Sequence, residues 1–324
     1  MRITIVDCDH ETFEEEQEVS AARGIELVRE HVTTEDEVIR VAHGADAILI
    51  QYAPVTAAVL DALPQLKAVG RYGVGVDTVD VEAATSRGVA VCNVPDYGVQ
   101  DVSDHAIALT MSVVRGTAQL DRLVRDGEYG LVPVKPLHRV STLRFGVLGL
   151  GRIGAATAVK ARALGFTVVG SDPQLEIGTY TADGIEVVDF ETVLTTSDVL
   201  SLHVPLLETT HHLIDEGALA RMKAGSVLVN TCRGAVIDTA AVAAALRSGH
   251  LKGAGLDVFE QEPLPQDSPL RDCPTAVLTP HASWYSEESE TELKRRVTEN
   301  VVEVVAGRRP RNILNPEVLG AGRG

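Results

Sequence analysis

The segment Gly149-Leu150-Gly151-Arg152-Ile153-Gly154 constrains the fold of this 324-residue chain more than any other feature. The apolar run 143–150 predicts a β-strand that leads into it, and the residues that follow predict a helix. In that setting the first glycine permits a tight turn, the second lets the backbone approach a pyrophosphate, and the third lets helix and strand pack closely. The segment therefore predicts a dinucleotide-binding unit in which the helix amino terminus faces the anion.

Asp172 strengthens this interpretation, because it ends the next predicted strand, 18 positions after Gly154. A carboxylate there accepts hydrogen bonds from the adenosine ribose hydroxyls. It would also repel a 2′-phosphate, and the following Pro173, Gln174 and Leu175 supply no cation to neutralise one. These residues predict NAD as the cofactor in preference to NADP. A turn cap is the alternative role for Asp172.

Strands and helices alternate through the chain, and its length predicts two domains at about 150 residues each. We expect an α/β fold of two doubly wound parallel sheets with a cleft between the domains. A single helix of about seven turns over 101–125 would bridge them. The helical pattern returns at 287–306, and the tail after Asn315 is expected to be frayed. The predicted strands are 3–6, 47–50, 67–70, 89–92, 143–150, 167–170, 185–188, 198–202, 226–230, 253–257 and 276–279.

Composition argues against several classes of protein. With 29 Lys and Arg against 46 Asp and Glu, the net charge of −17 would repel a phosphate backbone, so no direct nucleic-acid partner is expected. No apolar run approaches the roughly 18 residues that a membrane span requires, and the acidic amino-terminal segment does not resemble a secretory signal. Four cysteines without CxxC spacing indicate free thiols and no metal site. We expect a soluble cytoplasmic protein.

Three polar residues, Arg233, Glu262 and His281, interrupt strand ends that are otherwise apolar. The carboxyl ends of parallel strands lie on one edge, where doubly wound sheets bind their ligands. Reduction of a 2-oxo acid needs a guanidinium to hold the substrate carboxylate, which Arg233 supplies. It also needs a proton donor that titrates near neutrality, and imidazole suits this because its ordinary pKa is about 6.5. His281 is the candidate, with Glu262 fixing its tautomer and favouring its protonated form.

Five segments in order give the chain a resemblance to the D-isomer-specific 2-hydroxyacid dehydrogenases along almost its whole length: 71–77, 149–154, 229–234, 255–263 and 280–284. The resemblance implies that Arg233, Glu262 and His281 form the catalytic trio of an NAD-dependent oxidoreductase acting on small 2-oxo or 2-hydroxy acids. It also implies that Asp257 lies near the nicotinamide carboxamide.

The resemblance further implies a flavodoxin-like substrate domain, 1–98 with 286–324, a Rossmann NAD-binding domain, 99–285, and a homodimer built largely through the latter. The residues expected to contact the cofactor are Gly149, Gly151, Arg152, Ile153, Gly154, Asp172, Pro173, His203, Pro205, Thr210, Thr231, Cys232, Asp257 and Ser283. Those expected to contact the substrate are Arg71, Tyr72, Gly73, Val74, Gly75 and Trp284.

Within that family, residues 90–106 and 281–288 are most similar to the C-terminal binding proteins. There a tryptophan after the catalytic histidine lines the substrate pocket, so Trp284 favours a 2-oxo acid with an apolar side chain. Its alternative role is a core residue at a domain junction. The same likeness leaves open a different class of function, an NADH-sensing corepressor that recruits peptide motifs.

Three other activities occur on this framework. Phosphoglycerate dehydrogenases carry an arginine for the substrate phosphate where this chain has Gln51, although Arg71 or Lys67 nearby keeps that substrate possible. Formate dehydrogenases pair their histidine with glutamine, so Glu262 argues against formate. Phosphite oxidation stays a minor alternative. Tyr72 stands where the family usually has a smaller residue and is expected to narrow or polarise the pocket.

Overall fold

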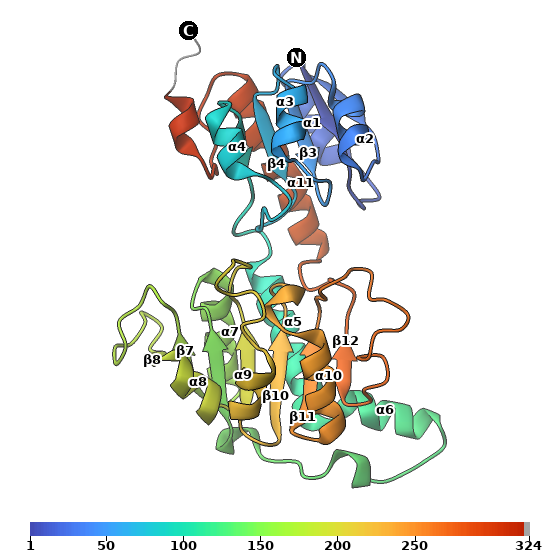
Figure 1. Ribbon diagram of the computed structural model, residues 1–324, viewed down its shortest axis with the longest axis vertical. Coiled ribbons are helices and arrows are strands. Elements are labelled where there is room, and N and C mark those ends of the chain that lie inside the picture. Colours follow the sequence, from blue (N-terminus) through green and yellow to red (C-terminus); the bar gives the residue numbers. More distant parts are fainter. Residues whose placement is uncertain (321–324) are drawn as a thin grey trace. The chain divides into compact units, whose positions relative to one another are not determined.

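The computed structural model describes residues 1–320, which form two compact units. One unit contains Met1–Tyr97 and the chain from Ser286 onward, and the other contains Gly98–Tyr285. Each has a parallel β-sheet between layers of helices (Figure 1). The predicted fold class, α/β with two parallel sheets, is confirmed.

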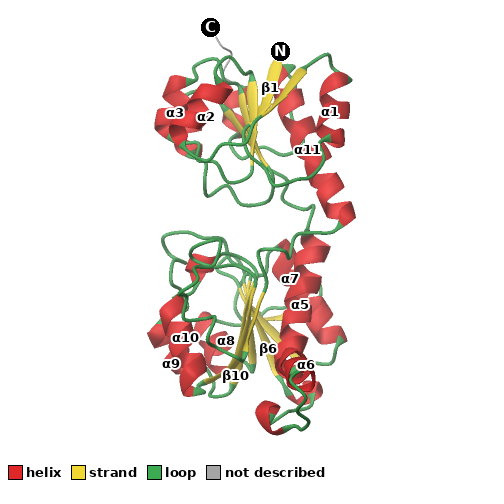
Figure 2. Ribbon diagram, turned by 90° about the vertical axis from the view of Figure 1, so that its right-hand side faces the viewer, coloured by secondary structure: helices red, strands yellow, loops and turns green. Residues whose placement is uncertain are grey.

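The first unit contains a five-stranded sheet in the order β2-β1-β3-β4-β5, the flavodoxin-like order. Helices α1 and α11 cover one face, and α2 and α3 cover the other (Figure 2). Gly70 lets α11 approach β4, because a Cβ there would lie 2.7 Å from both Leu49 Cδ2 and Val301 Cγ1. The strands are β1 Arg2–Ile5, β2 Glu26–Arg29, β3 Ala47–Ile50, β4 Ala68–Arg71 and β5 Ala90–Cys92. The helices are α1 Glu14–Ala21, α2 Glu35–Ala42, α3 Ala57–Ala62, α4 Val81–Ser86 and α11 Glu287–Val305.

The second unit contains a seven-stranded sheet in the order β12-β11-β10-β9-β6-β7-β8, all of it parallel. Helices α5 and α7 lie on one face, and α8 and α10 lie on the other (Figure 2). The order reverses between β6 and β9, and such a switch point is where doubly wound sheets bind nucleotides. The strands are β6 Arg144–Leu148, β7 Thr167–Ser171, β8 Glu186–Val187, β9 Val199–Leu202, β10 Ser226–Asn230, β11 Leu251–Leu256 and β12 Ala276–Leu278. The helices are α5 Val99–Arg115, α6 Thr117–Arg125, α7 Arg152–Ala163, α8 Phe190–Thr196, α9 Glu216–Arg221 and α10 Thr239–Ser248.

Two sequence expectations were wrong. The single helix over 101–125 is two helices, because Gly116 takes a left-handed conformation, φ 66°, that ends α5 and begins α6. The tail after Asn315 is ordered as far as a 3₁₀ helix at Pro316–Leu319, since buried Asn315 bonds the backbone of Val89 and Val91. The remainder of that tail, 321–324, lies outside the described residues.

The apolar pattern did not predict β2 and α1, both of which are half exposed. All four cysteines are free thiols. Within residues 1–320, no helix combines the length and the apolar character that crossing a bilayer requires.

Candidate active site

The glycine turn after β6 has the geometry that its three glycines predict. Gly149 adopts φ +89°, and a Cβ there would lie 2.5 Å from the His203 carbonyl oxygen, so this position requires glycine. A Cβ on Gly154 would lie 1.9 Å from the Gly149 carbonyl oxygen, which is why α7 packs directly against the turn. A Cβ on Gly151 would meet no atom within 4 Å among the described residues. The open side of the turn is therefore at Gly151, where a pyrophosphate would approach the amino terminus of α7.

Asp172 follows β7, which pairs with β6, so its carboxylate lies beside the same turn. Its Oδ2 accepts the Leu150 N–H at 2.9 Å, and its Oδ1 accepts the Gln174 N–H at 2.9 Å. The carboxylate thus holds the glycine turn and also caps its own turn. Both functions are compatible with a ribose contact, because each carboxylate oxygen has two lone pairs. Pro173, the next predicted cofactor contact, is exposed.

Five more of the predicted cofactor residues follow β9 and β10 on the same edge: His203, Pro205, Thr210, Thr231 and Cys232. His203 N–H bonds the Leu148 carbonyl at 2.8 Å, and burial lowers the pKa of His203 to about 4, which keeps its imidazole neutral at physiological pH. Thr210 Oγ1 donates to the Pro205 carbonyl at 2.6 Å and so closes the loop after β9. Thr231 Oγ1 is buried without a hydrogen-bond partner in the described chain, as a group awaiting a cofactor contact would be. Cys232 lies beside it, held by Asn230.

The structure brings His281 and Glu262 into direct contact. His281 Nδ1 lies 2.7 Å from Glu262 Oε2, and Glu262 Oε1 accepts the Phe259 N–H at 2.9 Å. Burial raises the pKa of the Glu262 carboxyl, but the hydrogen bond and charge of His281, together with the Phe259 N–H bond, outweigh burial and hold the pKa below its ordinary value. Because Nδ1 faces the carboxylate, Nε2 is the ring nitrogen left to face a substrate.

Arg233 reaches the same edge from β10. Buried Asn230 donates its side-chain N–H to the Arg233 carbonyl at 2.8 Å and accepts the Cys232 N–H at 3.0 Å, which shapes the turn that projects Arg233. Gly234 then packs against the next turn, since a Cβ there would lie 1.8 Å from the Phe259 carbonyl carbon. The turns that carry Arg233 and Glu262 are therefore in contact.

Asp257 is the fully buried centre of this edge, directly after β11. Its Oδ1 accepts the Ala282 N–H at 2.9 Å, its Oδ2 accepts the Ser283 N–H at 3.0 Å, and its carbonyl accepts the His281 N–H at 2.7 Å. These bonds hold His281 at φ +54°, a left-handed conformation that is uncommon outside glycine. Asp257 thus fixes the loop that presents His281 and Trp284.

Two further residues, which sequence reasoning missed, support the turns on this edge of the sheet. His105, on α5, lies 2.9 Å from Thr279 Oγ1 and 3.5 Å from Asp257 Oδ1. Glu260 accepts the Thr239 N–H at 2.9 Å and lies 2.6 Å from His212 Nε2, which secures the turn before Glu262. No local motif marks His105, because its partners are far away in the sequence. Glu260 lies within the segment 255–263, which the family resemblance had already singled out, so it was the easier of the two to find from the sequence.

The predicted substrate loop, 71–75, follows β4 in the first unit. The Tyr72 side chain is only 2% exposed, and its hydroxyl donates to buried Glu16 at 2.8 Å. Tyr72 therefore anchors the loop to α1 with its phenol enclosed by its own unit. Gly73 has φ +136° and lies under the Arg71 guanidinium, since a Cβ there would be 1.6 Å from Nη1.

Gln51, directly after β3, has an uncharged side chain that is already hydrogen-bonded. Its Oε1 accepts the Asp9 N–H at 2.8 Å, and its Nε2 donates to the Tyr52 hydroxyl at 2.9 Å. Lys67 precedes β4 and pairs with Asp46 at 2.6 Å, so it lies at the amino end of the sheet and not beside Gln51. Of the two cations that kept a phosphate possible, only Arg71 is at the carboxyl edge.

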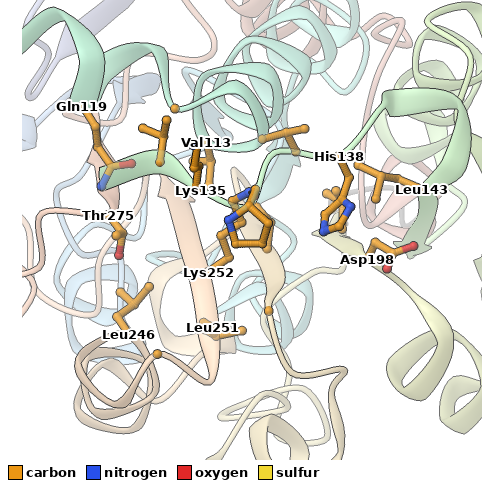
Figure 3. A pocket seen from close by; sticks show the side chains of 18 of the residues that line it. Val113, Gln119, Lys135, His138, Leu143, Asp198, Leu246, Leu251, Lys252 and Thr275 are labelled. Atoms are coloured by element: carbon orange, nitrogen blue, oxygen red, sulfur yellow. The ribbon is translucent and has the colours of Figure 1, made fainter. Parts of the chain in front are cut away.

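A cavity of about 440 Å³ opens at the opposite, amino end of the seven-stranded sheet (Figure 3). Lys135, His138, Asp198 and Lys252 are among the residues that line it. None of the predicted cofactor or catalytic residues does. Ligands of doubly wound sheets bind at the carboxyl ends of the strands, so this cavity is separate from the candidate active site.

A Rossmann sheet with an open glycine turn, and with paired imidazole and carboxylate groups on the same edge, defines an NAD-dependent oxidoreductase. Residues 107–283 match the family model described as D-isomer specific 2-hydroxyacid dehydrogenase, NAD binding domain. The chain belongs to the D-isomer-specific 2-hydroxyacid dehydrogenases, as the sequence resemblance implied, and its cofactor is NAD.

Relatives and solved structures agree with this assignment. A glyoxylate reductase of Korarchaeum cryptofilum is 41% identical over 269 residues, covering 82% of this chain and 81% of that protein. The crystal structure of the TT0316 protein of Thermus thermophilus superposes with a TM-score of 0.87 at 34% identity, covering 97% of this chain and 100% of that one. A D-lactate dehydrogenase of Aquifex aeolicus, solved with NAD and lactic acid, has a TM-score of 0.82 at 25% identity, covering 97% and 99%.

Proposed function

We propose that this protein is a 2-oxo acid reductase, and D-2-hydroxyacid dehydrogenase in reverse, whose substrates are small unphosphorylated acids of the glyoxylate class. The observation that carries the proposal is the 2.7 Å contact between His281 and Glu262 on the edge that also bears Arg233 and the glycine turn. Relatives named glyoxylate reductase, one of them 41% identical, support the substrate class.

In the proposed mechanism, Arg233 binds the substrate carboxylate through its planar pair of N–H donors and polarises the neighbouring carbonyl. His281 donates the proton on Nε2 to the carbonyl oxygen while Glu262 stabilises the imidazolium through Nδ1. NADH, when bound at the glycine turn, would supply the hydride to the carbonyl carbon. In the oxidative direction, neutral His281 accepts the hydroxyl proton at Nε2.

The neutral position at Gln51 supports a substrate without a phosphate. An amide cannot supply the charge-assisted bond that a phosphate group takes from arginine. Gln51 is also committed to Asp9 and Tyr52, and Lys67 lies at the other end of the sheet. We therefore expect 3-phosphohydroxypyruvate to be a poorer substrate than glyoxylate or hydroxypyruvate.

The decisive experiment measures NADH oxidation with glyoxylate, hydroxypyruvate, phenylpyruvate, 4-methylthio-2-oxobutyrate and 3-phosphohydroxypyruvate. We expect turnover on at least one unphosphorylated acid, and His281→Ala should lower kcat by about 10² to 10⁴-fold, the range for loss of a general acid. The exposed pair Arg221 and Glu191, which is 2.8 Å apart, offers a matched control, since Glu191→Gln should leave kcat unchanged. Absence of turnover on every acid would refute the proposal and favour a cofactor-sensing interaction protein.

We further propose that the protein is a homodimer that associates through its NAD-binding unit. No residue of α6 is buried, although the helix is amphipathic, and the segment after it exposes Tyr129, Leu131 and Val132 at 98%, 53% and 82%. An exposed apolar stretch of this kind indicates a protein interface. Sedimentation velocity should give a dimer that Val132→Asp weakens, and a monomer at micromolar concentration would refute this proposal.

A further inference from the structure

Thr279, directly after β12, connects α5 to the catalytic loop. Its hydroxyl donates to Asp257 Oδ1 at 2.6 Å, and His105 Nε2 lies 2.9 Å from the same hydroxyl oxygen. A threonine hydroxyl carries one proton, and a carboxylate oxygen can only accept. Because that proton goes to Asp257, His105 must donate its Nε2 proton to Thr279. The directions of both hydrogen bonds follow from this count.

The same carboxylate orients His281. Asp257 receives the N–H groups of Ala282 and Ser283, and its carbonyl receives that of His281. Asp257 is fully buried, so each of its bonds forms away from competing water. A rotation of the carboxylate would break these bonds. The left-handed backbone at His281 is strained and depends on the surrounding bonds to keep its conformation.

We propose that His105 and Thr279 are positioning residues for catalysis, which act through Asp257 to hold His281 against Glu262. This inference rests on the proposed function, because it assigns to His281 the role of acid and base. His105 comes from α5, 174 residues away from Thr279, and neither side chain needs to contact the substrate. Their role is to keep the loop 281–283 in its active conformation.

The test compares Thr279→Val, which removes the hydroxyl at nearly constant volume, with Thr279→Ser, which keeps it. We expect Thr279→Val to lower kcat about 10 to 100-fold, since misplacement of a catalytic group by about 1 Å costs on the order of 10²-fold. Thr279→Ser should retain activity within about threefold of the parent, well short of a tenfold loss. Thr110→Val is the matched control, because Thr110 is also buried but, among residues 1–320, its hydroxyl bonds only the Ala106 carbonyl of its own helix α5.

A second pair of variants tests the donor on α5. His105→Gln retains an N–H near the position of Nε2, whereas His105→Leu removes it. We expect kcat to follow the donor, with His105→Leu resembling Thr279→Val and His105→Gln partly restored. NADH affinity by fluorescence titration and the melting temperature are measured on every variant. The kcat values are then normalised to the protein that is folded and binds the cofactor.

The outcomes separate this inference from the proposed function. Full activity of His281→Ala would refute the acid and base assignment and with it both proposals. An inactive His281→Ala together with a fully active Thr279→Val would overturn only the positioning role. Equal loss of kcat in Thr279→Ser and Thr279→Val, or in Thr110→Val and Thr279→Val, would also overturn it, because the loss would then not follow the hydroxyl.

Discussion

Two neighbouring glycines allow cofactor binding to be separated from folding. In Gly154→Ala the new Cβ would lie 1.9 Å from the Gly149 carbonyl oxygen, about 1.5 Å inside an ordinary contact of roughly 3.4 Å. The obstacle is backbone, so α7 must move. Overpacking costs about 1–3 kcal/mol, and a clash this close with backbone falls in the upper part of that range, about 2–3 kcal/mol, against a gain of about 1 kcal/mol from alanine in a helix interior. We therefore expect Gly154→Ala to lower the free energy of unfolding by about 1–2 kcal/mol.

Gly151→Ala should behave differently, because its Cβ would meet no described atom within 4 Å and its backbone, φ −66°, suits alanine. The unfolding free energy should change by no more than about 0.5 kcal/mol, the cost of a poorer helix cap. The methyl group would occupy the open side of the turn, so NADH affinity should fall at least about tenfold, or 1.4 kcal/mol. Denaturant unfolding without cofactor and fluorescence titration with NADH measure the two quantities. Unchanged NADH affinity in Gly151→Ala, or unchanged stability in Gly154→Ala, would refute this account of the turn.

Three further predictions follow from other parts of the chain. Asp172→Ala should weaken NAD binding about tenfold and reduce the preference over NADP, and an unchanged ratio of the two Kd values would remove Asp172 from the ribose site. Asp257→Asn should lower kcat more than it lowers stability, measured by steady-state kinetics beside thermal unfolding, because the two backbone N–H groups bond different carboxylate oxygens and the NH2 of an amide would face one of them. Burial, helped by the charge of Lys294, lowers the pKa of His10 from 6.5 to about 4. As the pH falls from 6.5 to 4, His10 becomes protonated in the unfolded chain but stays neutral in the folded chain. The unfolding free energy should therefore drop by up to about 3 kcal/mol. In His10→Gln that slope should be smaller, and an identical slope would contradict the assignment.

Local patterns in the sequence were sufficient to predict the two parallel sheets and to nominate candidate residues for the site. Alternating apolar runs predicted the two parallel sheets, because strands buried on both faces are continuous hydrophobic segments. The spacing of the glycine motif and Asp172 was enough by itself to predict a dinucleotide site. Arg233, Glu262 and His281 were predicted as a catalytic trio because charged groups are uncommon at the ends of buried strands.

Tertiary structure decided how those groups are held. Gly116 divides the expected long helix, because its backbone is left-handed and packs against Val134. The apolar periodicity does not predict this break. The Tyr72 hydroxyl bonds Glu16, 56 residues away, which no motif predicts. His105 meets Thr279 and Asp257 only when α5 packs on the sheet. Spacing along the chain determines which groups reach an edge, whereas the partners of a side chain depend on contacts between segments that are distant in sequence.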